Sequence, residues 1–160
     1  NLKKFISVSS AEDMYQAVIS NLDENDAVIK SAAVADYKPK TYSDNKIKKK
    51  DGDLVIELDR NKDIAYEIGK IKNDKILVGF AAETNDIIEN AKAKIAKKNM
   101  DFIVANNLKE SGAGFGTDTN IVSIIEKDGS MKEYPMMTKE EVASVILDKI
   151  KTLLDNKSSL

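Results

Sequence analysis

The chain has 160 residues, of which 42% are hydrophobic, and a formal net charge of −2. This length and composition fit one globular domain over residues 1–160, and the near-neutral charge gives no global basic field for binding DNA or RNA. Because cysteine and histidine do not occur, the sequence excludes disulfides, a thiolate nucleophile, an imidazole base and the usual zinc sites. We expect a cytoplasmic protein without a membrane segment, because neither a signal peptide nor a long apolar run is visible.

Lysine, carboxylate, amide and backbone groups are left to carry any chemistry. A metal would have to be held by oxygen, which indicates Mg²⁺, brought in by the phosphates of a nucleotide. The positive charge is concentrated in residues 38–50, which contain six lysines and one acidic residue.

The amino-terminal part predicts a strand, a helix and a second strand. Residues 3–8 alternate loosely between polar and apolar side chains and are predicted to form a strand. Ser9 and Ser10, each followed three positions later by an acidic residue, form a capping-box pattern that predicts a helix over 11–22. The apolar run that follows predicts a central strand over 27–35.

The most informative stretch is the end of that second strand, where Ser-Ala-Ala-Val-Ala gives way to Asp36, Tyr37 and Lys38. Small side chains let a ligand or another backbone come close, and ligands in open α/β sheets bind just beyond the carboxyl ends of strands. Pro39 ends ladder pairing because it has no N–H. These residues alone leave two alternatives open, a ligand site and an ordinary strand end.

The middle of the chain predicts an exposed segment, a short strand, a helix and a buried strand. Residues 37–53 are polar and lysine-rich, and we expect a flexible, exposed flap. An Asp-Gly turn then leads to a strand over 54–58, which can pair with residues 47–50 as a hairpin. A helix over 64–71 and a continuous apolar strand over 76–82 follow.

The carboxyl-terminal half predicts further α/β structure and a hairpin. We expect a helix over 85–99, a buried strand over 101–105, a hairpin of residues 121–126 and 131–134, and a capped helix over 139–154. This order of elements predicts an α/β fold of three layers, with a mostly parallel sheet and β-hairpin additions.

Four segments resemble the phosphopantothenoylcysteine synthetase family. They are Ser-Ala-Ala-Val-Ala-Asp-Tyr at 31–37, Lys-Ile-Lys-Lys at 46–49, Gly-Phe-Ala-Ala-Glu-Thr at 79–84 and Ala-Asn-Asn at 105–107. The resemblance covers residues 3–154 and implies a Rossmann-like domain that forms homodimers, often the carboxyl-terminal half of a bifunctional flavoprotein of coenzyme A biosynthesis. It implies a ligase that uses CTP and Mg²⁺ to join 4′-phosphopantothenate to cysteine, with FMN only on a fused or separate decarboxylase.

In the family's reaction, the carboxylate of 4′-phosphopantothenate attacks the α-phosphorus of CTP, which gives an acyl-cytidylate and pyrophosphate. The amino group of cysteine then displaces the nucleotide monophosphate. Lysines and Mg²⁺ can stabilise the negative charge that develops in both steps, so no protein nucleophile is needed.

The resemblance also implies roles for single residues. Ala32, Ala33 and Asp36 match the floor of the nucleotide and pantothenate site, with Ala33 also against the substrate. Lys46 matches the catalytic lysine of a flap that closes over the reacting acyl-phosphate. The other nucleotide-binding positions implied are Lys62, Asp63, Ile64, Ala65, Phe80, Lys94 and Lys98.

The residues themselves leave simpler alternatives open. The alanines also suit strand packing, Lys46 suits a solvated charge run, and Asp63 suits plain helix capping. Phe80 also suits a core position, and Lys94 and Lys98 would be favoured by the helix macrodipole near a carboxyl terminus.

The sequence departs from the family pattern in one large respect. The family's Gly-Pro-Thr strand end and its Asn-x-Ser-Ser-Gly segment do not occur. We therefore expect a fragment that lacks an opening β-α-β unit, is inactive or severely impaired by itself, and depends on partner contacts. Two other classes stay open: a non-catalytic nucleotide-binding or dimerisation module, and an NAD(P)-binding Rossmann-like oxidoreductase, which the missing G-x-G-x-x-G pattern disfavours.

Overall fold

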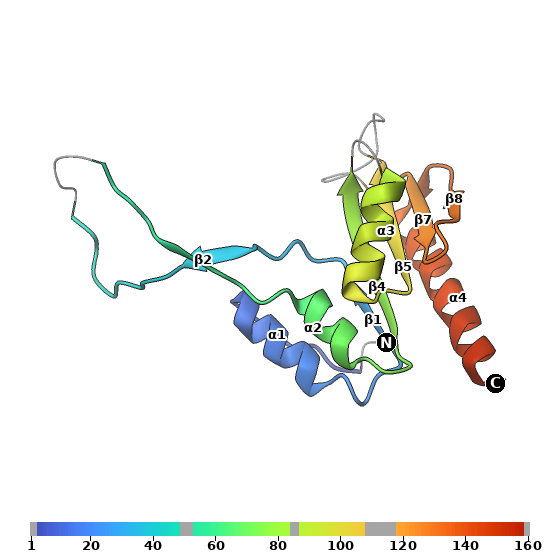
Figure 1. Cartoon of the computed structure of the whole chain (residues 1–160), viewed down its shortest axis with the longest axis horizontal. Helices are drawn as coiled ribbons and strands as arrows, with labels where there is room; N and C mark the ends of the chain where they lie inside the picture. The colour runs from blue at the N-terminus through green and yellow to red at the C-terminus, as the bar shows by residue number, and fades with distance from the viewer. Residues whose placement is uncertain (1–2, 49–52, 84–86, 108–117, 159–160) are drawn as a thin grey trace.

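A five-stranded mixed sheet forms the centre of the protein in the computed structural model, which describes residues 3–48, 53–83, 87–107 and 118–158 (Figure 1). The strand order is β1-β4-β5-β7-β8. β1, β4 and β5 are parallel, whereas β7 pairs antiparallel with both β5 and β8. Their bounds are Ala27–Lys30 for β1, Ile76–Glu83 for β4, Phe102–Asn107 for β5, Val122–Glu126 for β7 and Met131–Glu133 for β8.

Helices cover both faces of this sheet. Side chains alternate along the strands, so Leu77 and Ala81 of β4 join one apolar cluster and Val78 joins the other. The first cluster is covered by α1, α2 and α3 and the second by α4, which gives the three predicted layers. The helix bounds are Ala11–Ser20 for α1, Ile64–Ile71 for α2, Ile87–Lys98 for α3 and Lys139–Ser158 for α4.

Local capping signals in the sequence are confirmed at three helix starts. Ser10 and Asp13 form a reciprocal capping box at α1, and Thr138 and Glu141 do the same at α4. Asp63 caps α2, whose bounds are those predicted. Because each cap satisfies backbone N–H groups that have no partner within the helix, each stabilises its helix by about 1 kcal/mol.

The predicted carboxyl-terminal hairpin is confirmed as well. β7 and β8 are joined by a turn at Asp128-Gly129, where Gly129 has a φ of +84° and the Asp128 carboxylate accepts the Ser130 N–H at 2.8 Å. The described residues also form two small two-stranded sheets. β2 (Tyr37–Pro39) pairs with β3 (Leu58–Arg60), and β6 (Thr119–Asn120) pairs with β9 (Met137–Thr138).

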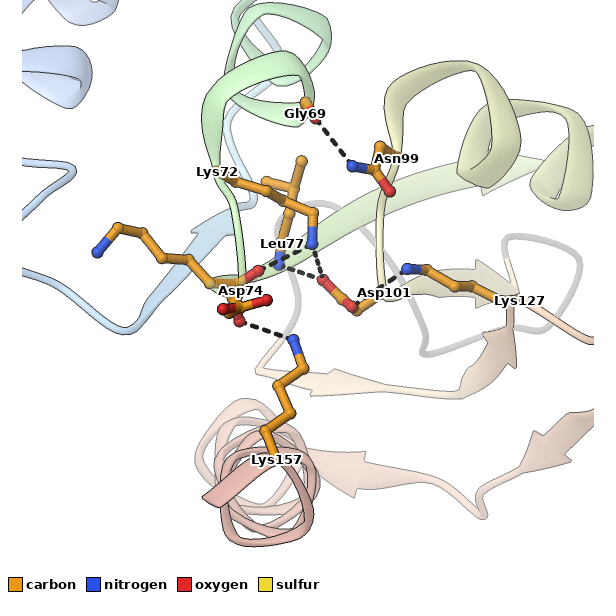
Figure 2. Close-up of polar contacts among 9 residues, drawn as sticks. Gly69, Lys72, Asp74, Leu77, Asn99, Asp101, Lys127 and Lys157 are labelled. Atoms are coloured by element: carbon orange, nitrogen blue, oxygen red, sulfur yellow. Dashed lines mark hydrogen bonds and ion pairs between the residues drawn. The ribbon is translucent and has the colours of Figure 1, made fainter. Parts of the chain in front are cut away.

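A buried ion pair joins α2 to the amino ends of two central strands (Figure 2). Lys72, the carboxyl-terminal cap of α2, is 3% exposed, and its ammonium lies 2.8 Å from Asp101 and donates to the Lys75 carbonyl. The same Asp101 oxygen accepts the Leu77 N–H at 2.8 Å. Beside this pair, the Asn99 side-chain amide donates to the Gly69 carbonyl at 2.9 Å, so α2 and α3 are fastened together at this end.

Two strand predictions at the amino-terminal side are wrong. Residues 3–8 form no strand, and β1 is a short edge strand rather than a central strand over 27–35. The described residues supply β1 with one neighbour, β4, and Phe5 stays 82% exposed. A strand exists only where a neighbour satisfies its backbone groups, which local alternation cannot reveal.

The strand predicted over 54–58 is wrong except at Leu58, which begins β3, and residues 49–50 of the predicted hairpin lie outside the described residues. In the described part of the flap, β2 pairs with β3 at the base, and the Lys40 N–H donates to the Glu57 carbonyl at 3.0 Å just beyond that pairing. Beyond it, residues 40–48 and 53–57, here called the arm, project away from the sheet (Figure 1). The predicted exposure of the flap is confirmed for its described residues. With no layer beneath it, the arm has no core to fix a strand over 54–58.

No helix in the described ranges is both long enough and apolar enough to cross a bilayer.

Candidate functional site

The segment after β1 lies beside the starts of α1 and α2 and lines a cavity of about 480 Å³. Ala32 and Ala33 form part of its wall, together with Ser10 and Ala11 at the start of α1 and Asn61 ahead of α2. We call this space the alanine cavity. The small side chains leave room close to the backbone, as the sequence predicted for a ligand site.

Asn61 holds this segment in place. Its side-chain amide donates to the Ala35 carbonyl at 2.9 Å, and its backbone N–H donates to the Asp36 carbonyl at 2.8 Å. These two bonds draw residues 31–36 away from the sheet and explain why β1 ends at Lys30. The two motifs at 31–37 and 62–65, separate in sequence, are therefore one structural unit.

Asp63 and Lys98, both predicted to bind nucleotide, lie together. One Asp63 oxygen accepts the Tyr66 N–H at 3.2 Å, and the other lies 2.8 Å from the Lys98 ammonium. Burial by itself would raise the pKa of Asp63, but the hydrogen bonds from Lys98 and Tyr66 and the positive charges of Lys98 and Lys30 outweigh it and lower the pKa. Lys94 lies exposed one turn earlier on α3.

Lys30 also belongs to this cluster, and sequence reasoning missed it. It is the last residue of β1, it is half-buried, and its ammonium donates to the Ala32 carbonyl at 3.2 Å. Burial lowers the pKa of Lys30, the positive charge of Lys98 lowers it further, and the carboxylates of Asp63 and Asp36 oppose both. The sequence feature that could have indicated Lys30 is its position at the end of an apolar strand, immediately before a run of small residues.

The family resemblance also implied that Lys62, Ile64 and Ala65 bind nucleotide, but among the described residues their side chains form no hydrogen bond or ion pair with Asp63 or Lys98. Lys62 pairs with Glu12 of α1 at 2.9 Å and lies over the ring of Tyr15. The hydrogen bond that Lys62 donates to Glu12 raises the pKa of Lys62. Ile64 and Ala65 are buried in the core, and Ile64 also lines a second cavity of about 480 Å³.

A family model described as "DNA/pantothenate metabolism flavoprotein C-terminal domain" matches residues 2–154. The chain belongs to this family. The "Coenzyme A biosynthesis bifunctional protein CoaBC" of Bacillus subtilis is 55% identical over 152 residues, which are 95% of this chain and 37% of that protein. The protein of the same name from Escherichia coli K12 is 37% identical over 159 residues, which are 97% of this chain and 39% of that protein.

A solved structure supports the same family assignment. The crystal structure of the C-terminal domain of a protein named CoaBC is similar with a TM-score of 0.76 and 44% identity, over 94% of this chain and 68% of that chain. The resemblance drawn from the four motifs is thereby confirmed, and so is the Rossmann-like α/β fold. The chain spans well under half the length of the curated relatives it matches.

Two residues that the family resemblance implied for the site, Phe80 and Lys46, lie away from Asp63 and Lys98 in this chain. Phe80 packs on the α4 face of the sheet, because it alternates with Gly79 and Ala81 along β4. Lys46 lies exposed on the arm, which projects from the body (Figure 1). The structure thus places Asp63 and Lys98 together at the start of α2, and Ala32 and Ala33 in the wall of the alanine cavity. It leaves Phe80 and Lys46 apart from the Asp63–Lys98 pair.

Among the described residues that line the alanine cavity, Glu12 carries the one carboxylate, and it pairs with Lys62 at 2.9 Å. Asp36 is exposed between two residues that line the cavity. Across the ranges that the structure describes, no group of three or more acidic side chains is placed to hold a metal ion. Small wall residues and Lys38, which also lines the cavity, make this place suited to an anionic ligand.

Proposed function

We propose that this chain is the ligase part of a coenzyme A biosynthesis enzyme, which joins 4′-phosphopantothenate to L-cysteine at the expense of CTP. The identity to the CoaBC proteins supports this, and so do the alanine cavity, lined by Ala32 and Ala33, and the Asp63–Lys98 pair. The Asp63–Lys98 pair is the observation that carries the proposal, because it joins two separate segments that the family pattern had implied to bind nucleotide.

Each residue would then have a defined task. Ala32 and Ala33 let the substrate carboxylate approach the nucleotide without a side chain between them. Lys98 and Lys94 bind the phosphates, and Lys46, carried in by the arm, neutralises the charge that develops on the α-phosphate. The carboxylate attacks the α-phosphorus, pyrophosphate leaves, and the cysteine amine then displaces CMP from the acyl-cytidylate.

Mg²⁺ would enter with the nucleotide phosphates, and Asp36, exposed beside the alanine cavity, would be its protein ligand, because Mg²⁺ prefers few carboxylates together with phosphate and water oxygens. When bound, it supplies positive charge that stabilises the transferring phosphate.

A calorimetric titration with CTP and Mg²⁺ tests the nucleotide assignment, with ATP and NAD⁺ as controls. We expect selective CTP binding, and Lys98→Gln should weaken it about tenfold because a charge-assisted contact is lost. Lys97→Gln is the matched control, since Lys97 is the exposed neighbour on α3, and it should stay within about twofold. Binding of NAD⁺ instead of CTP would refute the ligase assignment, and ligation by the purified chain would contradict its expected inactivity.

We further propose that two copies associate through the arm. Leu54, Val55 and Ile56 are 71%, 82% and 62% exposed, and Tyr42 on the other side of the arm is 89% exposed. Apolar side chains gathered on a projecting segment are typical of an interface rather than of a free surface.

Sedimentation velocity tests this association. We expect the wild type to sediment as a dimer and Ile56→Glu to sediment as a monomer, because a buried unpaired carboxylate opposes association. Leu147→Glu is the control, since Leu147 is comparably exposed, at 57%, but lies on α4. A monomeric wild type, or a dimeric Ile56→Glu variant, would contradict the proposal.

A further inference from the structure

Lys38 and Glu12 place opposite charges on the wall of the alanine cavity, and the proposed function uses neither of them. Lys38 lies in β2 and Glu12 in the first turn of α1, and both side chains line the cavity. Hydrogen bonds from Gln16 and Lys62 lower the pKa of Glu12, and the positive charge of Lys38 acts in the same direction. One cavity therefore presents a cationic and an anionic group that are close enough to act on each other.

Both groups keep bonding capacity for a ligand. Glu12 Oε1 accepts hydrogen bonds from Gln16 at 2.8 Å and from Lys62 at 2.9 Å, whereas Glu12 Oε2 has no partner among the described residues. Lys38 forms no ion pair in the described ranges, although Asp59 lies opposite it in the β2–β3 ladder. An ammonium has three donor hydrogens and a carboxylate has about four acceptor sites, so both groups can contact a bound molecule directly.

This pairing of charges favours a zwitterion over a polyanion. A polyphosphate would bring several negative charges toward Glu12, whereas an α-amino acid carries one carboxylate for Lys38 and one ammonium for Glu12. Much of the remaining wall is small and apolar, with Met14, Val34 and the alanines on it. The volume of about 480 Å³ is within the range of small-molecule sites, so the cavity suits a free amino acid in both size and charge.

We propose that the alanine cavity binds a zwitterionic α-amino acid, with Lys38 on its α-carboxylate and Glu12 Oε2 on its α-ammonium. This much rests on Lys38, Glu12 and the cavity alone. The identification of the amino acid as L-cysteine rests on the proposed function, in which an amine must reach an acyl group beside Ala32 and Ala33. The apolar wall then favours cysteine over serine, because a thiol behaves as a small apolar group.

Titrations followed by the NMR chemical shifts of backbone amides test the inference. L-cysteine should shift the amides of residues 10–12 and 32–35, which line the cavity, and should bind at least about threefold more tightly than L-serine. Because the chain contains no cysteine, L-cysteine cannot form a mixed disulfide with it. A wild-type chain whose amides in these two segments do not respond to L-cysteine would overturn the inference. Equal binding of L-serine would support the amino-acid site and overturn its identification with L-cysteine.

Truncated ligands assign each charge to its partner. Lys38→Gln should weaken L-cysteine binding about tenfold, because a charge-assisted contact is lost, and should leave cysteamine, which has no carboxylate, within about twofold. Glu12→Gln should also weaken L-cysteine binding about tenfold, and should leave 3-mercaptopropionate, which has no amine, within about twofold. Binding of the truncated ligand also shows that each variant is folded.

Lys40→Gln is the matched control, since Lys40 pairs with Glu57 at 3.3 Å and does not line the cavity, and it should leave all these titrations unchanged. A Lys38→Gln variant with a folded spectrum that binds L-cysteine as tightly as the wild type would overturn the inference. So would a folded variant that loses cysteamine binding to the same extent as L-cysteine binding.

A CTP titration of the same samples separates this inference from the proposed function. If L-cysteine binds as expected and CTP does not bind, the amino-acid site stands and the CTP assignment fails. If CTP binds selectively and L-cysteine shifts no amide of residues 10–12 and 32–35, the inference is overturned and the CTP assignment stands.

Discussion

Replacing Asp101 by asparagine should be among the most destabilising conservative changes in this protein. Asp101 is the counter-ion of the buried Lys72, and their side chains are 10% and 4% exposed (Figure 2). Asparagine keeps the shape and can still accept the Leu77 N–H, so the change isolates the charge. Because it leaves the Lys72 ammonium buried and uncompensated, we expect the free energy of unfolding to fall by about 3–5 kcal/mol.

Removing the other partner of this ion pair, Lys72, should lower the free energy of unfolding by less. Lys72→Met removes the ammonium, but the Asp101 carboxylate keeps the Leu77 N–H, and Lys127 lies 3.4 Å from its other oxygen. We therefore expect a loss of about 2 kcal/mol. In the double variant no charge is left unpaired between the two positions, so its loss should be smaller than the sum of the single losses.

Urea denaturation followed by circular dichroism at neutral pH measures these losses. Asp23→Asn, at an exposed site, is the control and should stay within about 0.5 kcal/mol of the wild type. A domain of this size has a total stability of about 5–15 kcal/mol, so the expected effect of Asp101→Asn is easily resolved. A loss below about 1 kcal/mol would falsify the view that Lys72 depends on this counter-ion.

Four further predictions can be checked by the same unfolding measurements. Burial would raise the pKa of Asp101, but hydrogen bonds from Lys72 and Leu77 and the charges of Lys72 and Lys127 outweigh it, so the pKa lies below its usual 3.8. Stability should therefore be lost as pH falls below about 3.8, and Asp101→Asn should show less of this loss. Gly69→Ala should lose about 1–3 kcal/mol, since its methyl group would meet the Lys98 carbonyl; a neutral result would refute that close approach. Ser10→Ala should lose about 1 kcal/mol with its cap, and an unchanged midpoint would contradict it. Gly129→Ala should lose about 1 kcal/mol because its φ is +84°, and a stabilised variant would be incompatible with that turn.

The helices could be predicted from the sequence because their determinants are local. The capping boxes at Ser10 and Thr138 and the cap at Asp63 involve residues within one turn of each other, so the pattern is readable in sequence. The same holds for the turn at Gly129, whose geometry follows from two adjacent residues.

Strand pairing was less predictable because it depends on neighbours that are distant in sequence. Residues 3–8 alternate as a strand should, yet no described strand lies beside them to pair. β1 stops at Lys30 because Asn61, far along the chain, pulls the next segment toward α2. The apolar residues of the arm likewise have no layer to pack against, so the strand that their composition predicted over 54–58 does not form over 54–57.

The membership of the candidate site stays a prediction from the family resemblance, and its geometry could not be predicted. The resemblance implied Asp63 and Lys98, which do lie together, but it could not show that Phe80 faces α4. β1, β4 and β5 step across the sheet in one direction, so right-handed crossovers place α2 and α3 on the same face. That direction follows from the spatial order of the strands, which could not be predicted from the sequence. Lys30 escaped notice for the same reason, since its neighbours come from other segments.

α2 links the buried ion pair to the candidate site. Its carboxyl-terminal cap is Lys72, anchored to Asp101, and its amino-terminal cap is Asp63, which holds Lys98. A helix of 8 residues that is fixed at one end can place the residue at its other end with little freedom. Loss of the Asp101 charge should therefore loosen the Asp63–Lys98 pair as well as the fold, so Asp101→Asn should weaken CTP binding in the calorimetric titration even under conditions where the variant remains folded. The arm that carries Lys46 is held at its base by the pairing of β2 with β3, so the role proposed for Lys46 requires the arm to move or to be fixed by a second copy.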